Sequence, residues 1–251
     1  MFKHIVLLFA IIGVLLALTF SLDRSEINKI YQIELSGNEY LPKENYLEYA
    51  KLNEVSNSDL SISLIHDRLE KHPYIKNVDV VIQERGIVQI EVFETPIEAM
   101  LLKDNEQLLL TAEAQIIPFL ENTINMNVPV IVNYAQVKDT KLFGNVTKDE
   151  YLMKALSIIT TAQFVDAELH NKISSINLNF GRSISIDIIG LNFPVFYGKN
   201  NEVKKTVYLS KVLNHLRDKK IKDYLDYLDL RYDNLVYLGF DNDSIVKKER
   251  T

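Results

Sequence analysis

The sequence predicts an α+β fold in two domains, preceded by an N-terminal transmembrane helix. Three observations lead to this prediction: an uncharged apolar run near the N-terminus, a strand-helix-helix-strand-strand order after it, and then a longer region of short strands with two amphipathic helices. The chain has 251 residues, of which 47% are hydrophobic and 25% are charged. Such a composition supports a hydrophobic core and argues against a disordered chain.

The apolar run occupies residues 5–22, and no Asp, Glu, Lys or Arg occurs between Lys3 and Asp23. A helix of this length, rising ~1.5 Å per residue, would span about 27 Å, close to the hydrocarbon thickness of a bilayer. A cleavable signal peptide is the alternative, but the run is longer than such segments usually are and lacks a clear small-residue cleavage site. We therefore expect a membrane anchor at residues 5–22, a cytoplasmic tail at residues 1–4 and the remaining chain outside the cytoplasm.

A small α+β domain is expected at residues 30–97, after a juxtamembrane linker at residues 23–29. Alternating apolar and polar residues predict its first strand. Pro42 is expected at the first position of the first helix, and Ser61 or Ser63 can cap the second helix. Two β-branched runs separated by Arg85-Gly86 predict a hairpin. The expected elements are a strand at residues 31–35, helices at 43–52 and 61–72, and strands at 75–82 and 87–93.

Residues 98–240 are expected to form a β-rich second domain with two helices. Apolar side chains at helical spacing, such as Leu152, Leu156 and Ile159, predict a helix at residues 148–164, and a similar pattern predicts a second one. A polar tail then occupies the chain's end. The second helix is expected at residues 203–216 and the tail at 241–251. Residues 128–132 are expected to be either extended or a loop. The expected strands lie at residues 98–102, 107–111, 116–117, 173–180, 183–189, 193–197, 227–232 and 235–240.

No set of residues in the sequence matches the requirements of catalysis or metal binding, so we predict that the protein is not an enzyme. It contains no Cys, which excludes disulfides, thiolate nucleophiles and cysteine-ligated zinc. Its five His residues lack metal-ligand spacing, and no phosphate-binding loop or nucleophile motif occurs. We predict no catalytic residue, no metal, no cofactor and no small-molecule substrate. The net charge of −6 argues against binding nucleic acid.

The last expected strand, residues 235–240, is unusually apolar for the end of a chain. If it lies at the edge of the sheet, its outer backbone N–H and C=O groups can accept an extended segment of a partner. Tyr237 and Phe240 are aromatic residues, the kind that dominate binding hot spots. The alternative is that Tyr237 or Phe240 belongs to the core and that Arg231 satisfies Asp229 or a carbonyl group inside the fold.

The anchor and five short strings point in order along the chain to a known family. The strings are Ile33-Glu34-Leu35-Ser36-Gly37-Asn38, Leu69 with His72-Pro73-Tyr74-Ile75 and Val78 and Val80, Glu91-Val92-Phe93-Glu94-Thr95-Pro96-Ile97-Glu98-Ala99, Gly198-Lys199, and Leu228-Asp229-Leu230-Arg231-Tyr232-Asp233-Asn234. Together they resemble the FtsQ/DivIB family of bacterial cell-division proteins, in which an anchor precedes a POTRA domain and a β domain. The sequence departs from that pattern where Arg85-Gly86 stands in place of a proline and where residues 111–115 replace a glycine turn.

The resemblance implies a non-catalytic, single-pass divisome scaffold at the inner membrane and division septum, with its ectodomain in the periplasm. It implies that the protein recruits or regulates FtsB/FtsL-type coiled-coil partners, and through them septal peptidoglycan synthesis. Two other classes stay open: a POTRA-containing assembly or secretion factor, and an extracytoplasmic ligand-binding sensor. The positions that match the family's partner-binding residues are Tyr232, Asn234, Gly239 and Phe240, with Lys199 as a charged contact, and the edge-strand argument adds Leu235 and Tyr237.

Overall fold

A computed structural model describes residues 30, 32–53, 60–83, 86–103, 106–134, 142–217, 219, 221 and 224–240. The chain divides into two compact units. The first ends at Thr95 and also contains residues 122–124, and the second contains the rest, beginning at Pro96. The boundary expected from the sequence, between residues 97 and 98, lies two residues further along.

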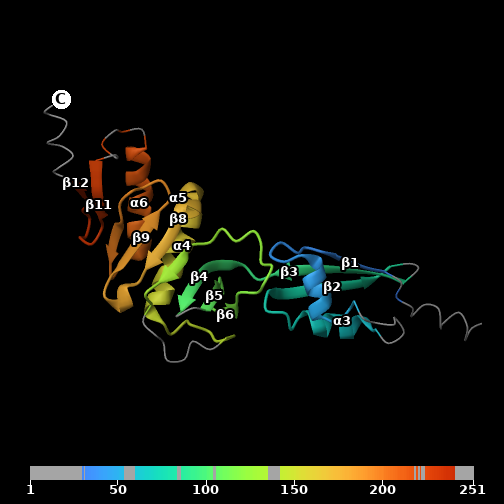
Figure 1. The fold of residues 1–251 in the computed structure, drawn as a ribbon. Helices are drawn as coiled ribbons and strands as arrows, with labels where there is room; N and C mark the ends of the chain where they lie inside the picture. Colours follow the sequence, from blue (N-terminus) through green and yellow to red (C-terminus); the bar gives the residue numbers. More distant parts are fainter. Residues whose placement is uncertain are drawn as a thin grey trace, which may run out of the picture. The chain divides into compact units, whose positions relative to one another are not determined.

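Within the described residues, the first unit is a three-stranded sheet with two helices (Figure 1). β1 (Gln32–Ser36) pairs in parallel with β3 (Ile87–Glu94), and β2 (Ile75–Ile82) pairs with β3 on the other side in the antiparallel sense. Helices α2 (Lys43–Tyr49) and α3 (Ile62–Leu69) follow β1 in the chain, and α3 packs against β2. The order of elements is the strand-helix-helix-strand-strand order that the sequence predicts.

Short-range signals in the sequence set the start of both helices, and a contact between the two helices stabilises the C-terminal end of α2. Pro42 is the N-cap residue of α2, one position before the first helical position that we expected it to occupy. Ser61 caps α3, because its Oγ accepts a hydrogen bond from the backbone N–H of Leu64 at 3.2 Å. Arg68 Nη1 donates to the backbone oxygen of Ala50 at 3.1 Å, which satisfies a carbonyl at the C-terminal end of α2.

Glu94, at the end of β3, holds the turn after β1 in place through hydrogen bonds. Its carboxylate accepts hydrogen bonds from the backbone N–H groups of Glu39 and Tyr40, at 2.9 and 3.0 Å, and from the hydroxyl of Tyr46. Gly37 begins this turn with φ of +81°, and a Cβ there would overlap a backbone carbonyl of β3. Two strings far apart in the sequence therefore meet at one place in the fold.

His72 is buried in the first unit, where it is 3% exposed. The rings of Tyr46, Tyr49 and Tyr74 lie 4.5, 4.7 and 5.6 Å from its own, measured between centroids. Its Nδ1 accepts a hydrogen bond from the backbone N–H of Tyr74 at 3.1 Å. Burial lowers the pKa of His72 to about 4, because the charged imidazolium would lose its hydration.

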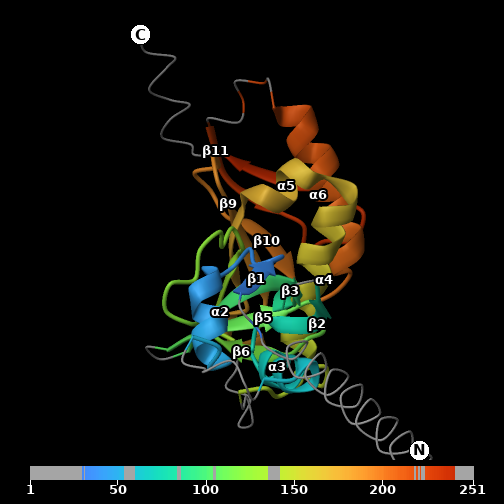
Figure 2. The same cartoon turned by 90° about the vertical axis from the view of Figure 1, so that its right-hand side faces the viewer.

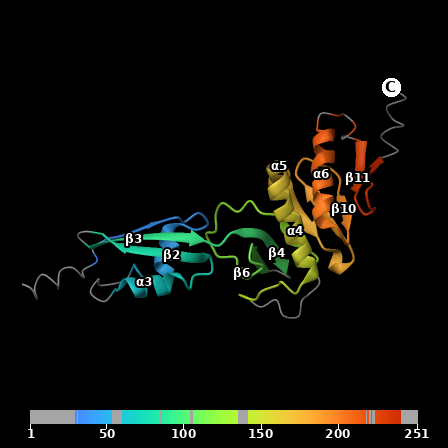
Figure 3. The same cartoon turned by 180° about the vertical axis from the view of Figure 1, so that it is seen from behind.

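Within the described residues, the second unit is a nine-stranded sheet in the order β12-β11-β10-β9-β8-β7-β4-β5-β6. Its helices gather on one side of the strands (Figure 2), and α4 and α6 run beside each other (Figure 3). The strands are β4 (Ile97–Lys103), β5 (Glu106–Thr111), β6 (Ile116–Pro118), β7 (Val130–Val132), β8 (Ile173–Asn177), β9 (Ile184–Ile188), β10 (Val195–Gly198), β11 (Leu225–Asp229) and β12 (Tyr237–Phe240). The helices are α4 (Glu150–Val165), α5 (Ala167–Lys172), α6 (Glu202–Leu216) and the 3-10 turn η2 (Asn179–Gly181).

One row of buried aliphatic side chains crosses this sheet from strand to strand. Each member is paired in register with the next, none is more than 7% exposed, and all belong to the core that the helices cover. Because successive residues of a strand point to opposite faces, the residues that flank this row lie on the other face, which we call the outer face. The members of this core row are Leu228, Val195, Ile186, Ile176, Ile131, Leu101 and Leu108.

The structure corrects two parts of the predicted fold class. In the described part of the second unit there are three α-helices and not two, because α5 was not expected. The anchor expected at residues 5–22 lies outside the described residues, and none of the described helices is long and apolar enough to cross a membrane. The fold of the described residues is therefore a mixed α+β fold with five α-helices and two sheets, and no membrane-spanning helix is among them.

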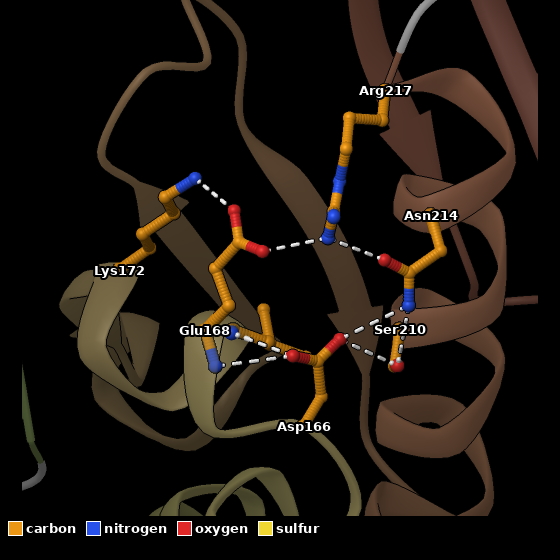
Figure 4. Close-up of polar contacts among 7 residues, drawn as sticks. Asp166, Glu168, Lys172, Ser210, Asn214 and Arg217 are labelled. Atoms are coloured by element: carbon orange, nitrogen blue, oxygen red, sulfur yellow. Dashed lines mark hydrogen bonds and ion pairs between the residues drawn. The ribbon is translucent and has the colours of Figure 1, made fainter.

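Helix α5 could not be predicted from the spacing of apolar residues, because it has six residues and a single buried side chain, Leu169. Asp166 sets its start, since its carboxylate accepts from the backbone N–H groups of Glu168 and Leu169, both at 3.1 Å. Ser210 and Asn214 of α6 donate to the same carboxylate at 2.8 and 3.2 Å (Figure 4). Burial raises the pKa of Asp166, but these hydrogen bonds lower it by more, so it lies below its usual value.

Acidification should destabilise the first unit through His72. The pKa is about 6.5 in the unfolded chain and about 4 in the fold, so between these values the unfolded chain binds more protons and stability is lost as the pH falls. We expect a loss of up to about 2 kcal/mol between pH 7 and pH 4.5. His72→Gln, whose amide oxygen can still accept from Tyr74, should lose less over the same range. Urea unfolding of both proteins, followed by circular dichroism at the two pH values, tests this; equal losses would contradict it.

Asp166→Ala should lower the free energy of unfolding by about 1–2 kcal/mol at pH 7, because α5 loses its cap and α6 loses an acceptor. The matched control is Glu168→Ala, which removes ion pairs of 2.6 Å to Lys172 and Arg217 between exposed groups and should cost less than Asp166→Ala does. The effect of Asp166→Ala should shrink below about pH 4, where the unfolded carboxylate is protonated. Denaturant unfolding of the two variants measures the difference, and equal losses at pH 7 would refute the assignment.

Candidate partner-binding edge

Strand β12 lies at one end of the nine-stranded sheet and, in the described part of the chain, pairs with β11 alone. The pairing is antiparallel and sets Leu238 opposite Leu228 and Tyr237 opposite Asp229. The side of β12 away from β11 is therefore an edge, where backbone groups can pair with another chain. We call β12 together with the turn at Tyr232–Leu235 the candidate edge.

The opposite end of the sheet is not open in the same way. Beyond β6, the backbone N–H of Ile116 donates to Gly144 at 3.0 Å, and the backbone N–H of Phe143 donates to Ile116 at 2.7 Å. A bridge between Gln115 and Asn145 continues this pairing. The chain thus covers one end of its sheet with its own backbone, whereas the described residues provide no such cover for β12.

The side chains of β12 differ in their exposure to solvent, and two of its aromatic rings stay exposed. Leu238 packs against the core, whereas Tyr237 is 48% exposed and Phe240 is 38% exposed. The alternative that places these two aromatic side chains in the core is therefore wrong. Tyr232 and Leu235 in the turn are also more than half exposed, and the rings of Tyr232 and Tyr237 meet edge to face with centroids 5.0 Å apart.

The turn before β12 is held by the beginning of α6. Asn234 has φ of +62°, a left-handed conformation that Asn tolerates better than most residues. Lys204 Nζ donates to Asn234 Oδ1 at 2.6 Å, and Asn201 Nδ2 donates to Asp233 Oδ1 at 3.0 Å. Lys199 is exposed two residues before Asn201. These contacts bring the two expected parts of the site, the loop after β10 and the turn before β12, side by side.

Arg231 forms a bidentate ion pair with Asp229 at the end of β11. Its Nε lies 2.9 and 3.0 Å from the two carboxylate oxygens, and its Nη2 lies 2.6 Å from Oδ2. Burial raises the pKa of Asp229, but the hydrogen bonds and charge of Arg231, together with the charge of Lys205, lower it by more. The guanidinium also lies 5.2 Å from the centroid of the Phe196 ring. This confirms the expected alternative in which Arg231 satisfies Asp229 within the fold, and it assigns Arg231 a structural role.

Tyr227 belongs to this region but was missed by sequence reasoning. It is paired in register with Gly239, and its ring lies over that glycine, so a Cβ on Gly239 would overlap the ring. On its other side the ring centroid lies 6.0 Å from that of Phe196 on β10. Gly239 thus has a structural reason to be glycine. No local signal marks Tyr227, because the register between β11 and β12 is a property of the folded sheet.

The described residues contain no group of three or more His, Asp or Glu side chains that could hold a metal ion. No protein-family model and no curated protein sequence matches the chain. The geometry of the candidate edge and the strings quoted from the sequence are therefore the basis for a functional proposal.

A double-mutant cycle tests the packing of Tyr227 over Gly239. Gly239→Ala alone should destabilise the second unit by about 1 kcal/mol, because the ring must leave its place beside Phe196. In a Tyr227→Ala background the same change should cost much less, since the overlapping atoms belong to the Tyr227 ring. Denaturant unfolding of the four proteins gives the coupling. Additive losses would show that the ring does not lie over the glycine in solution.

Proposed function

We propose that this protein is a non-catalytic scaffold of the bacterial division machinery, similar in role to FtsQ/DivIB. In this proposal it captures an FtsB/FtsL-type coiled-coil partner at the division septum and so influences septal peptidoglycan synthesis. The observation that carries the proposal is the unpaired side of β12, which is flanked by exposed aromatic side chains in the described structure.

An extended segment of the partner would add to the sheet beside β12. Backbone hydrogen bonds along the edge would supply affinity, and the alternating side chains of the edge would supply selectivity. Tyr237 and Phe240 are the exposed aromatic candidates for anchoring contacts. The turn that contains Asn234 is already held by Lys204, so little conformational entropy needs to be lost there on binding.

The class of partner can be established by purifying the full chain from its native host together with whatever it binds. Recovery of two small single-pass proteins with coiled-coil heptads would support the proposal. Recovery of no such pair, under conditions in which the chain is intact and folded, would overturn it.

Phe240→Glu should abolish capture of the partner, because a carboxylate would replace an apolar contact at the edge and would be desolvated on binding. The matched control is Phe164→Glu on α4, which changes an aromatic side chain that is 85% exposed but lies outside the candidate edge. Capture by the control should equal that of the unmodified chain, measured by pull-down at equal protein concentration.

Deletion of the chain from Leu235 onward should also abolish capture. Since Leu238 contributes to the core, circular dichroism must first show that the shortened protein is folded. Unchanged capture by a folded, shortened chain would refute binding at β12.

A further inference from the structure

We propose that Tyr227, one strand in from the edge, determines which segments the candidate edge accepts. The occupant that we infer is an extended segment with apolar side chains at alternate positions, one of which reaches the Tyr227 ring across Gly239. This inference rests on the proposed function, which supplies the added strand, and it identifies the side-chain chemistry that the strand must present.

The first step is the position of the ring. Tyr227 is rooted on β11, but the atoms Cδ1, Cε1 and Cζ of its ring occupy the space that a side chain on Gly239 would fill. The ring therefore covers β12 on the outer face and extends toward the edge. On the side away from the edge, the ring of Phe196 on β10 lies next to the Tyr227 ring, with 6.0 Å between the two centroids. Tyr227 is nevertheless 37% exposed, so part of the ring remains available for contact.

The second step is the pleat of the sheet. Neighbouring strands lie about 4.8 Å apart, and residues paired across them point their side chains to the same face. A residue of the added strand that pairs with Gly239 would therefore point to the outer face, as Tyr227 does. Because glycine has no side chain, nothing from β12 would separate this residue from the Tyr227 ring. Two positions along, the next outward side chain would meet Tyr237.

The third step is the chemistry of the surroundings. Tyr237 pairs with Tyr232 on one side, and Phe196 backs the Tyr227 ring on the other. The guanidinium of Arg231 lies over Phe196 and is already paired with the Asp229 carboxylate, so this ion pair offers little attraction to a charged side chain of the partner. An aliphatic or aromatic side chain suits this aromatic surface best, because it gains contact area and loses little hydration.

Photo-crosslinking in the native host tests the inference on the full chain. p-Benzoylphenylalanine is introduced in place of Tyr227, of Phe240, or of Tyr208 on α6 as the control. We expect the same partner to crosslink at positions 227 and 240 and not at position 208. The crosslinked peptide from position 227 should contain an apolar residue at the site of attachment.

The outcomes separate the inference from the proposed function. A partner crosslinked at position 240 but not at 227 would overturn the inference and leave the proposed function standing. No partner at either position would overturn both. A crosslink at position 227 alone, or one to a second copy or to another segment of the same chain, would overturn the inference, because the occupant would then not be a strand added at β12.

Substitution of Tyr227 provides a second measurement. Tyr227→Ala should weaken capture about tenfold, whereas Tyr227→Phe, which keeps the ring, should capture the partner as the unmodified chain does. Circular dichroism confirms that each variant is folded before the pull-down. Equal capture by Tyr227→Ala and Tyr227→Phe would refute a contact between the partner and the ring.

Discussion

The second unit depends on the core row, the line of buried aliphatic side chains that runs from Leu228 to Leu108 in register across the strands. A shift of any strand by one residue would turn its apolar side chains to the outer face, so burial of the row fixes the register of the whole sheet. Once the register is set, the outward direction of every flanking residue is set with it. The outward direction of Tyr227 and Tyr237 is a consequence of that constraint.

An open sheet of this kind has two edges, and the chain treats them differently. Backbone bonds from Phe143 and Gly144 pair with β6 at one end, whereas β12 at the other end keeps an unpaired side in the described residues. Unpaired edges are a hazard for aggregation unless they are short, covered or used for binding. β12 has only four residues, and its preceding turn is held in place by α6. An edge that is short and pre-ordered in this way suits selective capture of a partner.

Several residues that the family resemblance assigns to partner binding also stabilise the fold. Gly239 makes room for the Tyr227 ring, and Asn234 adopts a left-handed conformation while accepting a hydrogen bond from Lys204. Substituting either one would disturb the edge even if it touched no partner. Tyr237 and Phe240 are different, since both are exposed and a change there tests binding with less effect on the fold.

The strand-helix-helix-strand-strand order, the two long helices of the second unit and the apolar last strand could all be predicted from the sequence. They depend on residue spacing and on caps within a few positions. The sequence did not reveal α5, whose start depends on Asp166 meeting two side chains of α6. The pairing of Arg231 with Asp229 could be anticipated, since the residues lie two positions apart. The position of β12 at the end of the sheet and the packing of Tyr227 over Gly239 became known from the folded arrangement of the strands. Strand order and register arise from contacts between residues distant in the sequence, and local patterns carry no record of those contacts.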